Sequence, residues 1–290
     1  MSSLLKRLRR TRHFRQEEIK ASTTIEDPLP QPAVELRVPN APEHGLRIAN
    51  IPDVQAREGV ELDHLDHAGK YIAAKQPDII NCIGDWWDLP SLSDWNKPGS
   101  LEKENRRYEA DVAVGCDAME RFLNPIAKVA GYKPLMVFEL GNHEDRVVRA
   151  YRADPSRFTG RLRDLRLEQY GWKVIPYLQP VVIGGVAFCH FFPTGVMGRP
   201  VQSARALLSK MHMSCVAGHQ QGRDIAYSRN AAGKTLTGLI SGSFYQHNEP
   251  YMSPLANRHW RGMWMFHEVK DGQFDEMAVS ISFLKRKFGP

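Results

Sequence analysis

The chain has 290 residues, of which 42% are hydrophobic and 25% are charged, a composition typical of a globular protein. No run of about 18 consecutive apolar residues occurs, so we expect no transmembrane helix. The first 20 residues lack the apolar stretch of a secretory signal, and the four cysteines contain no C-x-x-C pair. We therefore expect a cytoplasmic protein with buried, reduced thiols.

The net charge of +6 is concentrated at one end of the chain. Residues 1–20 contain seven Lys or Arg and two Glu, a net charge of +5, whereas the other 270 residues together carry +1. A basic arm favours binding to nucleic acid or another polyanion. The alternatives are a solvated tail that aids solubility, and a short helix that docks on a partner through Leu4, Leu5 and Leu8.

The remaining chain divides into a linker and one folded domain. Residues 21–45 contain five prolines and little periodicity, so residues 1–45 are predicted to form a basic, proline-rich arm and linker, and residues 46–290 the domain. The first half of the domain alternates strands (46–53, 78–85, 134–141) with helices (64–76, 101–131, 145–153). The second half reads mostly as short strands between glycine-containing turns (172–177, 180–192, 214–220, 224–229, 234–244, 263–269, 277–284). This order indicates an α/β domain.

Several of the predicted strands end in a polar cluster. The clusters are IPDVQ with Asp53 and Gln55, IGDWWD with Asp85 and Asp88, LGNHEDR with Asn142 and His143, FCHFF with His190, and AGHQQG with His219 and Gln221. Ligands of open α/β sheets bind at the carboxyl ends of strands, where such side chains converge. Carboxylates and imidazoles suit Mn, Fe and Zn, and one carboxylate can bridge two ions. Each cluster alone has an ordinary explanation as a polar turn or a core histidine, but the ordered set of five favours a metal site.

In this order the motifs resemble those of the calcineurin-like metallophosphoesterase superfamily, which run D-x-H, G-D-x-x-D, G-N-H-E/D, a single His and G-H-x-H. The resemblance covers about residues 46–222, and the following segment looks like that of phage-encoded members, which would place the protein in the host cytoplasm. It implies a four-layer α-β-β-α sandwich of two mixed sheets, here preceded by the basic N-terminal extension. It also implies two divalent metal ions, Mn²⁺ first, with Zn²⁺, Fe or Mg²⁺ as alternatives.

The resemblance also implies how the ligands divide between two metal sites that share Asp85. Asn142, His190 and His219 would complete one site, and Asp53, Gln55 and Gln221 the other. Gln55 and Gln221 stand where the family pattern has histidine, and both fall on the same site. A neutral amide oxygen is a poorer donor than imidazole for borderline metals. We therefore expect one firm site and one weaker site that favours harder ions.

His143 and Asp88 are the implied catalytic residues. His143 would stand beside the scissile phosphate, as general acid for the leaving oxygen or as stabiliser of transition-state charge, while metal-bound hydroxide attacks phosphorus in line. Asp88 would orient His143 through its other ring nitrogen. Arg146 is a candidate phosphate ligand; the alternative is pairing with Glu144 or Asp145.

Other side chains have two interpretations each. Trp86 and Trp87, with Trp95 nearby, are candidates for stacking on nucleobases, and packing beneath the loop is the alternative. His64 and His67 lie three residues apart in a predicted helix and are expected on the surface.

We thus predict a metal-dependent phosphoester hydrolase, either a phosphodiesterase or nuclease or a nucleotide phosphatase. Its partners would be a phosphoester substrate and, through the arm, nucleic acid or nucleotide; no membrane partner is expected. G-D-x-x-D without a following Arg-Gly argues against a close protein Ser/Thr phosphatase. The alternative is a catalytically degenerate domain that binds nucleic acid or another partner. Gln55 and Gln221 favour this alternative, and the intact Asp88 and His143 argue against it.

Overall fold

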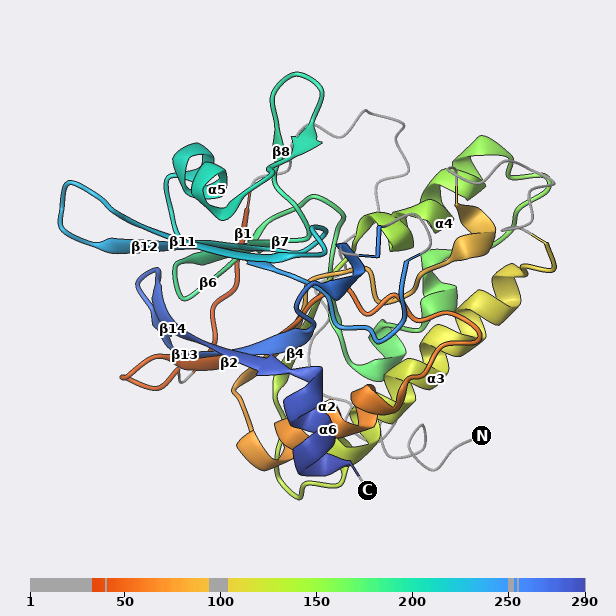
Figure 1. Cartoon of the computed structure of the whole chain (residues 1–290), viewed down its shortest axis with the longest axis horizontal. Helices are drawn as coiled ribbons and strands as arrows, with labels where there is room; N and C mark the ends of the chain where they lie inside the picture. The colour runs from red at the N-terminus through yellow and green to blue at the C-terminus, as the bar shows by residue number, and fades with distance from the viewer. Residues whose placement is uncertain (1–32, 40, 94–103, 250–252, 255, 290) are drawn as a thin grey trace.

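The computed structural model describes residues 33–39, 41–93, 104–249, 253–254 and 256–289. Within these residues the chain forms a mixed α/β structure with two large mixed sheets (Figure 1). Residues 1–20, predicted to be the basic arm, and Trp95 lie outside the described residues.

We call the two large sheets sheet I and sheet II, and each has six described strands. Sheet I contains, in spatial order, β1 (Val34–Glu35), β6 (Val181–Ile183), β7 (Val186–Cys189), β10 (Cys215–Ala217), β12 (Thr235–Ser241) and β11 (Arg223–Arg229). Sheet II contains β14 (Gln273–Ser280), β13 (Gly262–Lys270), β2 (Leu46–Ile51), β3 (Ile79–Cys82), β4 (Leu135–Glu139) and β5 (Lys173–Ile175). A separate two-stranded sheet is formed by β8 (Pro193–Thr194) and β9 (Arg199–Pro200).

Parallel pairing places strand ends together in both sheets. In sheet II, β2, β3, β4 and β5 run parallel to one another. In sheet I, β10 runs parallel to its neighbours β7 and β12. β1 lies within the segment predicted as a linker and pairs in parallel with β6, Val34 opposite Val181. Neighbouring parallel strands bring the loops that follow them to the same edge of a sheet.

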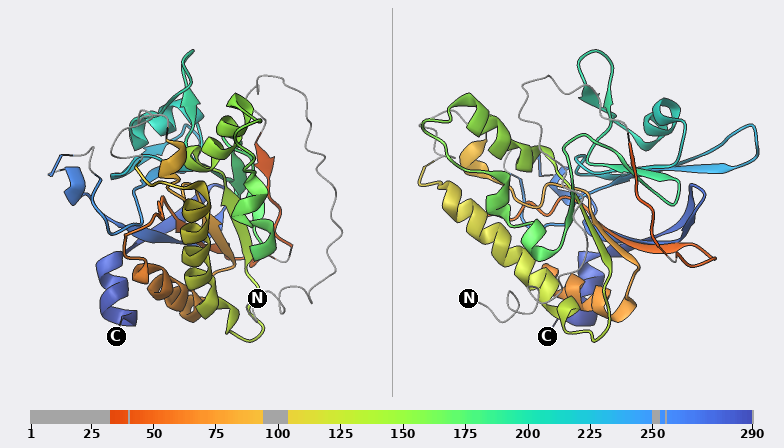
Figure 2. Two further views of the ribbon diagram at one scale, coloured as in Figure 1. Left: turned by 90° about the vertical axis from the view of Figure 1, so that its right-hand side faces the viewer. Right: turned by 180° about the vertical axis from the view of Figure 1, so that it is seen from behind.

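Helices cover the outer faces of both sheets (Figures 1 and 2). They are α2 (Asp63–Lys75), α3 (Tyr108–Ala127), α4 (Asn142–Ala153), α5 (Ala204–Met211) and α6 (Ile281–Phe288). Short 3₁₀ helices are η1 (Pro90–Leu92), η3 (Leu162–Leu165), η4 (Glu168–Tyr170) and η5 (Ala256–Arg258). α2, α3 and α6 accompany sheet II, α5 packs on sheet I, and α4 extends beyond the strand ends.

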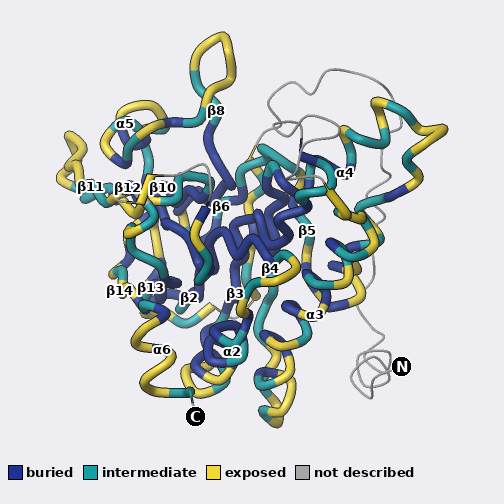
Figure 3. Tube along the Cα trace, turned by 45° about the vertical axis from the view of Figure 1, so that its right-hand side comes forward, coloured by how far each residue is buried: buried dark blue, intermediate teal, exposed yellow. Residues whose placement is uncertain are grey.

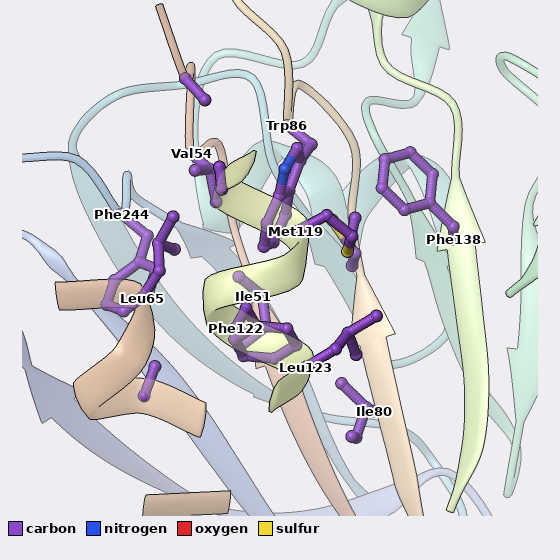
Figure 4. Packing of buried hydrophobic residues seen from close by; sticks show 14 of the residues in the cluster. Ile51, Val54, Leu65, Ile80, Trp86, Met119, Phe122, Leu123, Phe138 and Phe244 are labelled. Carbon is purple, nitrogen blue, oxygen red and sulfur yellow. The ribbon is translucent and has the colours of Figure 1, made fainter. Parts of the chain in front are cut away.

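Three apolar clusters hold these parts together (Figure 3). Successive residues of β3 face opposite sides of sheet II. Ile79 packs between the two sheets, and Ile80 packs toward the helices. Phe122 of α3 meets Trp86 edge-on, with the ring centroids 5.5 Å apart (Figure 4). Each large side chain buried in this way contributes about 2 kcal/mol. Both faces of the central strands are therefore buried, which explains their near-continuous apolar sequences.

The second half contains two short helices, α5 and α6, that were not predicted, and only α6 replaces part of a predicted strand. α6 begins at Ile281, inside the segment 277–284 that was predicted to be a strand. Ser280 ends β14 and caps the helix, since its hydroxyl accepts a hydrogen bond from the backbone N–H of Phe283 at 3.1 Å. Ser203 caps α5 in the same way, through the N–H of Ala206 at 3.2 Å. At both places a serine N-cap is followed by apolar residues three apart, a pattern that indicates the start of a helix.

The four cysteines are buried and form no disulfide, as predicted. None of the helices in the described part of the chain is long and apolar enough to cross a membrane.

Candidate metal centre

Five loops meet where the two sheets present the carboxyl ends of their parallel strands. The loops after β2, β3 and β4 come from sheet II, and those after β7 and β10 come from sheet I. They carry Asp53, Asp85, Asn142, His190 and His219, respectively. The residues singled out in the sequence thus lie on five strand ends that come from both sheets.

Four side chains approach one point closely enough to share an ion. Ligand atoms of Asp85, His190 and His219 all lie within 4.8 Å of one another. The Oδ1 atom of Asn142 lies 2.7 Å from Nδ1 of His219 and 2.9 Å from Nε2 of His190. Nε2 of His190 lies 3.3 Å from Oδ2 of Asp85. Ligand atoms about 2.1 Å from one ion lie about 3 to 3.5 Å apart, so the spacing suits a single divalent cation.

His190 is oriented by the strand next to it. Its Nδ1 donates to the backbone carbonyl of Ile83 at 2.8 Å, because that oxygen can only accept. Nε2 is thereby turned toward Asp85 and Asn142. A backbone carbonyl that fixes the second nitrogen is the usual support of a metal-binding histidine.

The ionisable groups of the centre strongly perturb one another. Burial alone would lower the pKa of His190, but Asp85 beside it raises that pKa to about 10. Burial would raise the pKa of Asp85, but His143 and His190 hold it well below its ordinary value. The pKa of His219 is lowered to about 4 by burial and by His190. In the absence of a cation, a proton on His190 therefore compensates the buried charge of Asp85, and a bound cation would take that place.

Asp53 and the two glutamines lie beside this group of side chains. Asp53 is fully buried, and its carboxylate accepts from the N–H of His219 at 3.1 Å and from Nε2 of Gln221 at 3.3 Å. Burial and the neighbouring Asp85 raise the pKa of Asp53 to about 7. The Oε1 atom of Gln221 is buried with no hydrogen-bond partner, and Gln55 is buried in the same loop as Asp53. Gln221 thus has an amide oxygen without a partner next to Asp53, whose carboxylate is close to that of Asp85. A second cation could bind these oxygens and offset the repulsion between the two carboxylates.

His143 and Asp88 adopt the relation that the motif implies. Nδ1 of His143 lies 3.2 Å from Oδ1 of Asp88, a close ion-pair contact rather than an aligned hydrogen bond. Nε2 of the same ring faces the centre, 3.7 Å from Oδ2 of Asp85. Burial would raise the pKa of Asp88, but the contact with His143 lowers it to about 2. Asp88 is therefore a fixed negative charge behind the imidazole.

Arg146 is part of this arrangement, and the alternative of pairing with Glu144 or Asp145 is wrong, because those carboxylates have other partners. Its side chain is buried, and Nη1 donates to the backbone carbonyl of Asp88 at 2.6 Å. Nη2 lies 3.0 Å from Nε2 of His143. The guanidinium thus stands beside the nitrogen that faces the centre, and phosphate contact stays a prediction.

Glu144 has a structural role that its position in the G-N-H-E motif did not reveal. Its carboxylate accepts four backbone N–H groups, from Gly141 at 2.8 Å, Asp85 at 2.9 Å, Trp86 at 2.8 Å and Trp87 at 3.1 Å. It therefore ties the loop after β3 to the first turn of α4. Asp145, by contrast, pairs with Arg149.

Arg57 and Glu249 are site residues that the sequence reasoning missed. Nη1 of Arg57 lies 3.1 Å from Oδ2 of Asp88 and 3.2 Å from Oε2 of Glu249, and all three side chains are largely buried. Glu249 in turn contacts His247 at 2.6 Å. Arg57 could have been noticed in the sequence, because it follows Gln55 by two residues. Glu249 lies 192 residues from Arg57 and belongs to none of the motifs.

Three residues of the centre adopt an unusual backbone conformation. Gln55, Asp85 and His219 have φ of +46°, +54° and +66°, a left-handed region that non-glycine residues rarely occupy. Gly141 allows Asp85 to approach, since a Cβ there would lie 2.1 Å from the Asp85 Oδ1 atom. Strain of this kind costs about 1 kcal/mol or more per residue and clusters at functional sites.

Of the two interpretations of Trp86 and Trp87, packing beneath the loop is confirmed and stacking on a nucleobase is wrong, and the expected exposure of His64 and His67 is also wrong. Trp86 and Trp87 are completely buried, and their ring N–H groups donate to backbone carbonyls of α3 at 3.1 and 3.3 Å. They pack beneath the loop and offer no face to a nucleobase. His64 and His67 are buried rather than exposed, and Nε2 of His64 lies 2.9 Å from the carbonyl oxygen of Phe244. Tertiary packing of α6 and the segment after β12 covers that side of α2.

No protein-family model matches the chain, and a search of curated proteins found no significant match. The function must therefore be inferred from the side chains that meet at these strand ends.

Proposed function

We propose that the chain is a metal-dependent phosphoester hydrolase of the calcineurin-like metallophosphoesterase superfamily. The observation that carries the proposal is the meeting of Asp85, Asn142, His190 and His219 around one point, from strand ends in both sheets. The order of α5, sheet I, sheet II and the group α2, α3 and α6 supports the four-layer sandwich that the motifs imply.

Two cations would be held with Asp85 between them. One would bind Asn142, His190 and His219, and the other Asp53, Gln55 and Gln221. The ions would supply Lewis acidity toward a phosphoryl oxygen and a nucleophilic water at neutral pH. With two amide ligands, the second site is expected to bind more weakly and to prefer Mn²⁺ or Mg²⁺ to Zn²⁺.

The protein's own contribution to the reaction centres on His143. In the structure Nε2 accepts a hydrogen bond from Arg146 at 3.0 Å, because a guanidinium can only donate. Once a substrate phosphate draws Arg146 away from Nε2, a proton on that nitrogen would be donated to the leaving oxygen of the phosphoester. Asp88 holds the opposite nitrogen, and Arg57 fixes the other oxygen of Asp88. Arg146 places a permanent positive charge next to Nε2, where it can stabilise charge that develops on the phosphoryl oxygens.

The substrate is proposed to be a phosphodiester, and hydrolysis of model esters tests this. The full chain would be assayed on bis-nitrophenyl phosphate and nitrophenyl phosphate while Mn²⁺ is titrated. We expect metal-dependent turnover of the diester, a loss of about 10²- to 10⁴-fold in His143→Ala, and no loss in the exposed control His44→Ala. No turnover above background with Mn²⁺, Zn²⁺, Fe²⁺ or Mg²⁺ would contradict the proposal, and turnover of the monoester alone would indicate a phosphatase.

A catalytically degenerate binding domain is the second candidate, and the two glutamines favour it. Nε2 of Gln221 donates to Asp53, so this amide satisfies a carboxylate without any cation. A degenerate domain would bind one metal ion, or none, and would turn over neither ester at any metal concentration.

A further inference from the structure

A dense group of arginines begins at the metal centre and continues away from it. Residues 146–166 contain seven arginines and two aspartates, a net charge of +5, although the chain beyond residue 20 is almost neutral overall. The exposed members, which we call the arginine face, are Arg149, Arg152, Arg157, Arg163 and Arg166. They lie on α4 and on the segment that follows it to η3 (Figures 1 and 3).

Neighbouring carboxylates cancel only part of this charge. Arg149 pairs with Asp145 at 3.2 Å and Arg157 with Asp154 at 3.5 Å. In the described parts of the chain, Arg152, Arg163 and Arg166 form no ion pair with a carboxylate. The second aspartate of the segment, Asp164, is occupied by the N–H of Arg161 at 2.7 Å and the hydroxyl of Tyr108 at 3.0 Å. A surplus of positive charge therefore faces solvent.

The arginine face rests on a rigid support. The rings of Tyr108 and Phe158 pack edge-on, with centroids 4.9 Å apart, which ties the segment to α3. The guanidinium of Arg161 lies over the ring of Tyr151, 3.4 Å from its centroid, and Leu165 is completely buried. A pre-ordered surface loses little conformational entropy when it binds a partner.

The direction of α4 relates the arginine face to the proposed reaction. The helix starts at Asn142 in the centre, so Arg149 and Arg152 lie about 10 and 15 Å along its axis at about 1.5 Å per residue. Phosphates of one strand of a duplex recur about every 3.4 Å along the helix axis. A strand with one phosphate in the centre would thus pass Arg149 and Arg152 about three and four nucleotides further on. All seven basic residues are arginines, whose planar guanidinium binds phosphate oxygens in pairs.

We propose that the arginine face binds the sugar–phosphate backbone of a polynucleotide whose scissile phosphodiester lies in the metal centre. The inference rests on the proposed function and deepens it, because it specifies the substrate class and the surface that holds it. A charged face with several well-separated arginines matches a repeated anion better than a single phosphate group. The basic stretch of residues 1–20 would then add to binding rather than provide it alone.

Charge reversal in the full-length chain tests the proposal. Arg152→Glu, Arg163→Glu and Arg166→Glu are combined, and binding of labelled single-stranded DNA, duplex DNA and RNA is followed by fluorescence anisotropy at several salt concentrations. We expect at least about tenfold weaker binding at low salt and a salt slope reduced by about 2 to 3, since each lost phosphate contact removes about 0.9. The three probes show which polynucleotide is preferred.

Two matched controls separate this surface from general charge effects. Lys285→Glu, Arg286→Glu and Lys287→Glu make the same charge change on the exposed side of α6, and Arg9→Gln, Arg10→Gln and Arg12→Gln reduce the charge of the N-terminal stretch. The α6 variant is expected to bind within about twofold of the unchanged chain. Equal losses in the arginine-face variant and the α6 variant, or a loss in the N-terminal variant alone, would overturn the proposal.

A second readout separates failure of this inference from failure of the proposed function. Arg152→Gln, Arg163→Gln and Arg166→Gln form a milder variant that keeps the test valid if charge reversal impairs folding. Its turnover of bis-nitrophenyl phosphate is expected to be unchanged, because none of the three arginines contacts the metal centre. Suppose that the unchanged chain turns over neither ester but binds a polynucleotide, and that this binding is lost with the three arginines. The binding surface would then be retained and the hydrolase rejected. Normal turnover together with polynucleotide binding that the arginine substitutions do not weaken would retain the hydrolase and reject the binding surface.

Discussion

At the residue scale, the centre is a set of buried charges that hold one another in place. Asp88 illustrates this, since one of its oxygens meets His143 and the other meets Arg57. The sequence revealed Asp88 because it stands at a fixed distance from Asp85 in one loop. It did not reveal Glu249, because the contact with Arg57 forms only when distant segments fold together. Burial of such groups is tolerated only when each has its partner.

Replacing Arg57 tests this network. Arg57→Met leaves Asp88 and Glu249 without their shared cation, so we expect a loss of about 3 kcal/mol in the free energy of unfolding. Because Asp88 would then be free to turn away from His143, kcat should fall at least about tenfold with little change in KM. Arg57→Lys keeps the charge and should recover part of both. Urea unfolding and steady-state kinetics measure the two effects, and a Met variant equal to the unchanged chain in both would refute this role.

At the element scale, the predicted strands of both halves of the domain were largely confirmed, but the two short helices of the second half were not predicted. Strands β2, β3 and β4 match predicted segments because they are apolar runs bounded by polar turns. α5 and α6 are eight residues each, too short for helical periodicity to stand out from strand alternation. The polar ends of β2, β3 and β4 were visible in the sequence, but the bond between the β3 loop and α4 through Glu144 depends on tertiary geometry.

Glu144 therefore offers a test of how two elements are joined. Glu144→Ala removes the acceptor of four backbone N–H groups, so we expect a loss of at least about 2 kcal/mol in the free energy of unfolding. Asp85 would shift with its loop, and Mn²⁺ affinity should fall. The neighbouring Asp145→Ala breaks only a surface pair with Arg149 and should cost less than about 1 kcal/mol. Similar losses in the two variants, by urea unfolding and calorimetric Mn²⁺ titration, would show that Glu144 does not join these elements.

At the scale of the whole molecule, the centre lies where both sheets end. Sheet II supplies Asp53, Asp85 and Asn142, and sheet I supplies His190 and His219. A cation held by both sheets would stabilise the entire fold by mass action, by about 2.7 kcal/mol when its concentration is 100 times its Kd. The architecture as a mixed α/β structure was predictable from the order of elements. The contacts between the sheets were not, because they join residues far apart in the sequence.

Global stability should also depend on pH through His64, which joins α2 to the segment after β12. Burial lowers the pKa of His64 from 6.5 to about 4. Below pH 6.5 the unfolded chain therefore binds a proton that the folded chain does not, and His64 reduces the free energy of unfolding as pH falls toward about 4. The full contribution is about 3 kcal/mol. His64→Gln should be less stable at pH 7.5, but the difference should shrink by pH 5. Urea unfolding measures the difference in stability between the unchanged chain and His64→Gln at both pH values. An equal difference at pH 7.5 and pH 5 would exclude this contribution.

The most direct test of the central claim is the stoichiometry of Mn²⁺ binding to the metal-depleted full chain by calorimetry. The account predicts one tight and one weaker site in the unchanged chain, loss of both in Asp85→Ala, and no change in Asp275→Ala on the exposed part of β14. A chain that binds no Mn²⁺, or an Asp85→Ala variant that binds it as well as the unchanged chain does, would contradict the account.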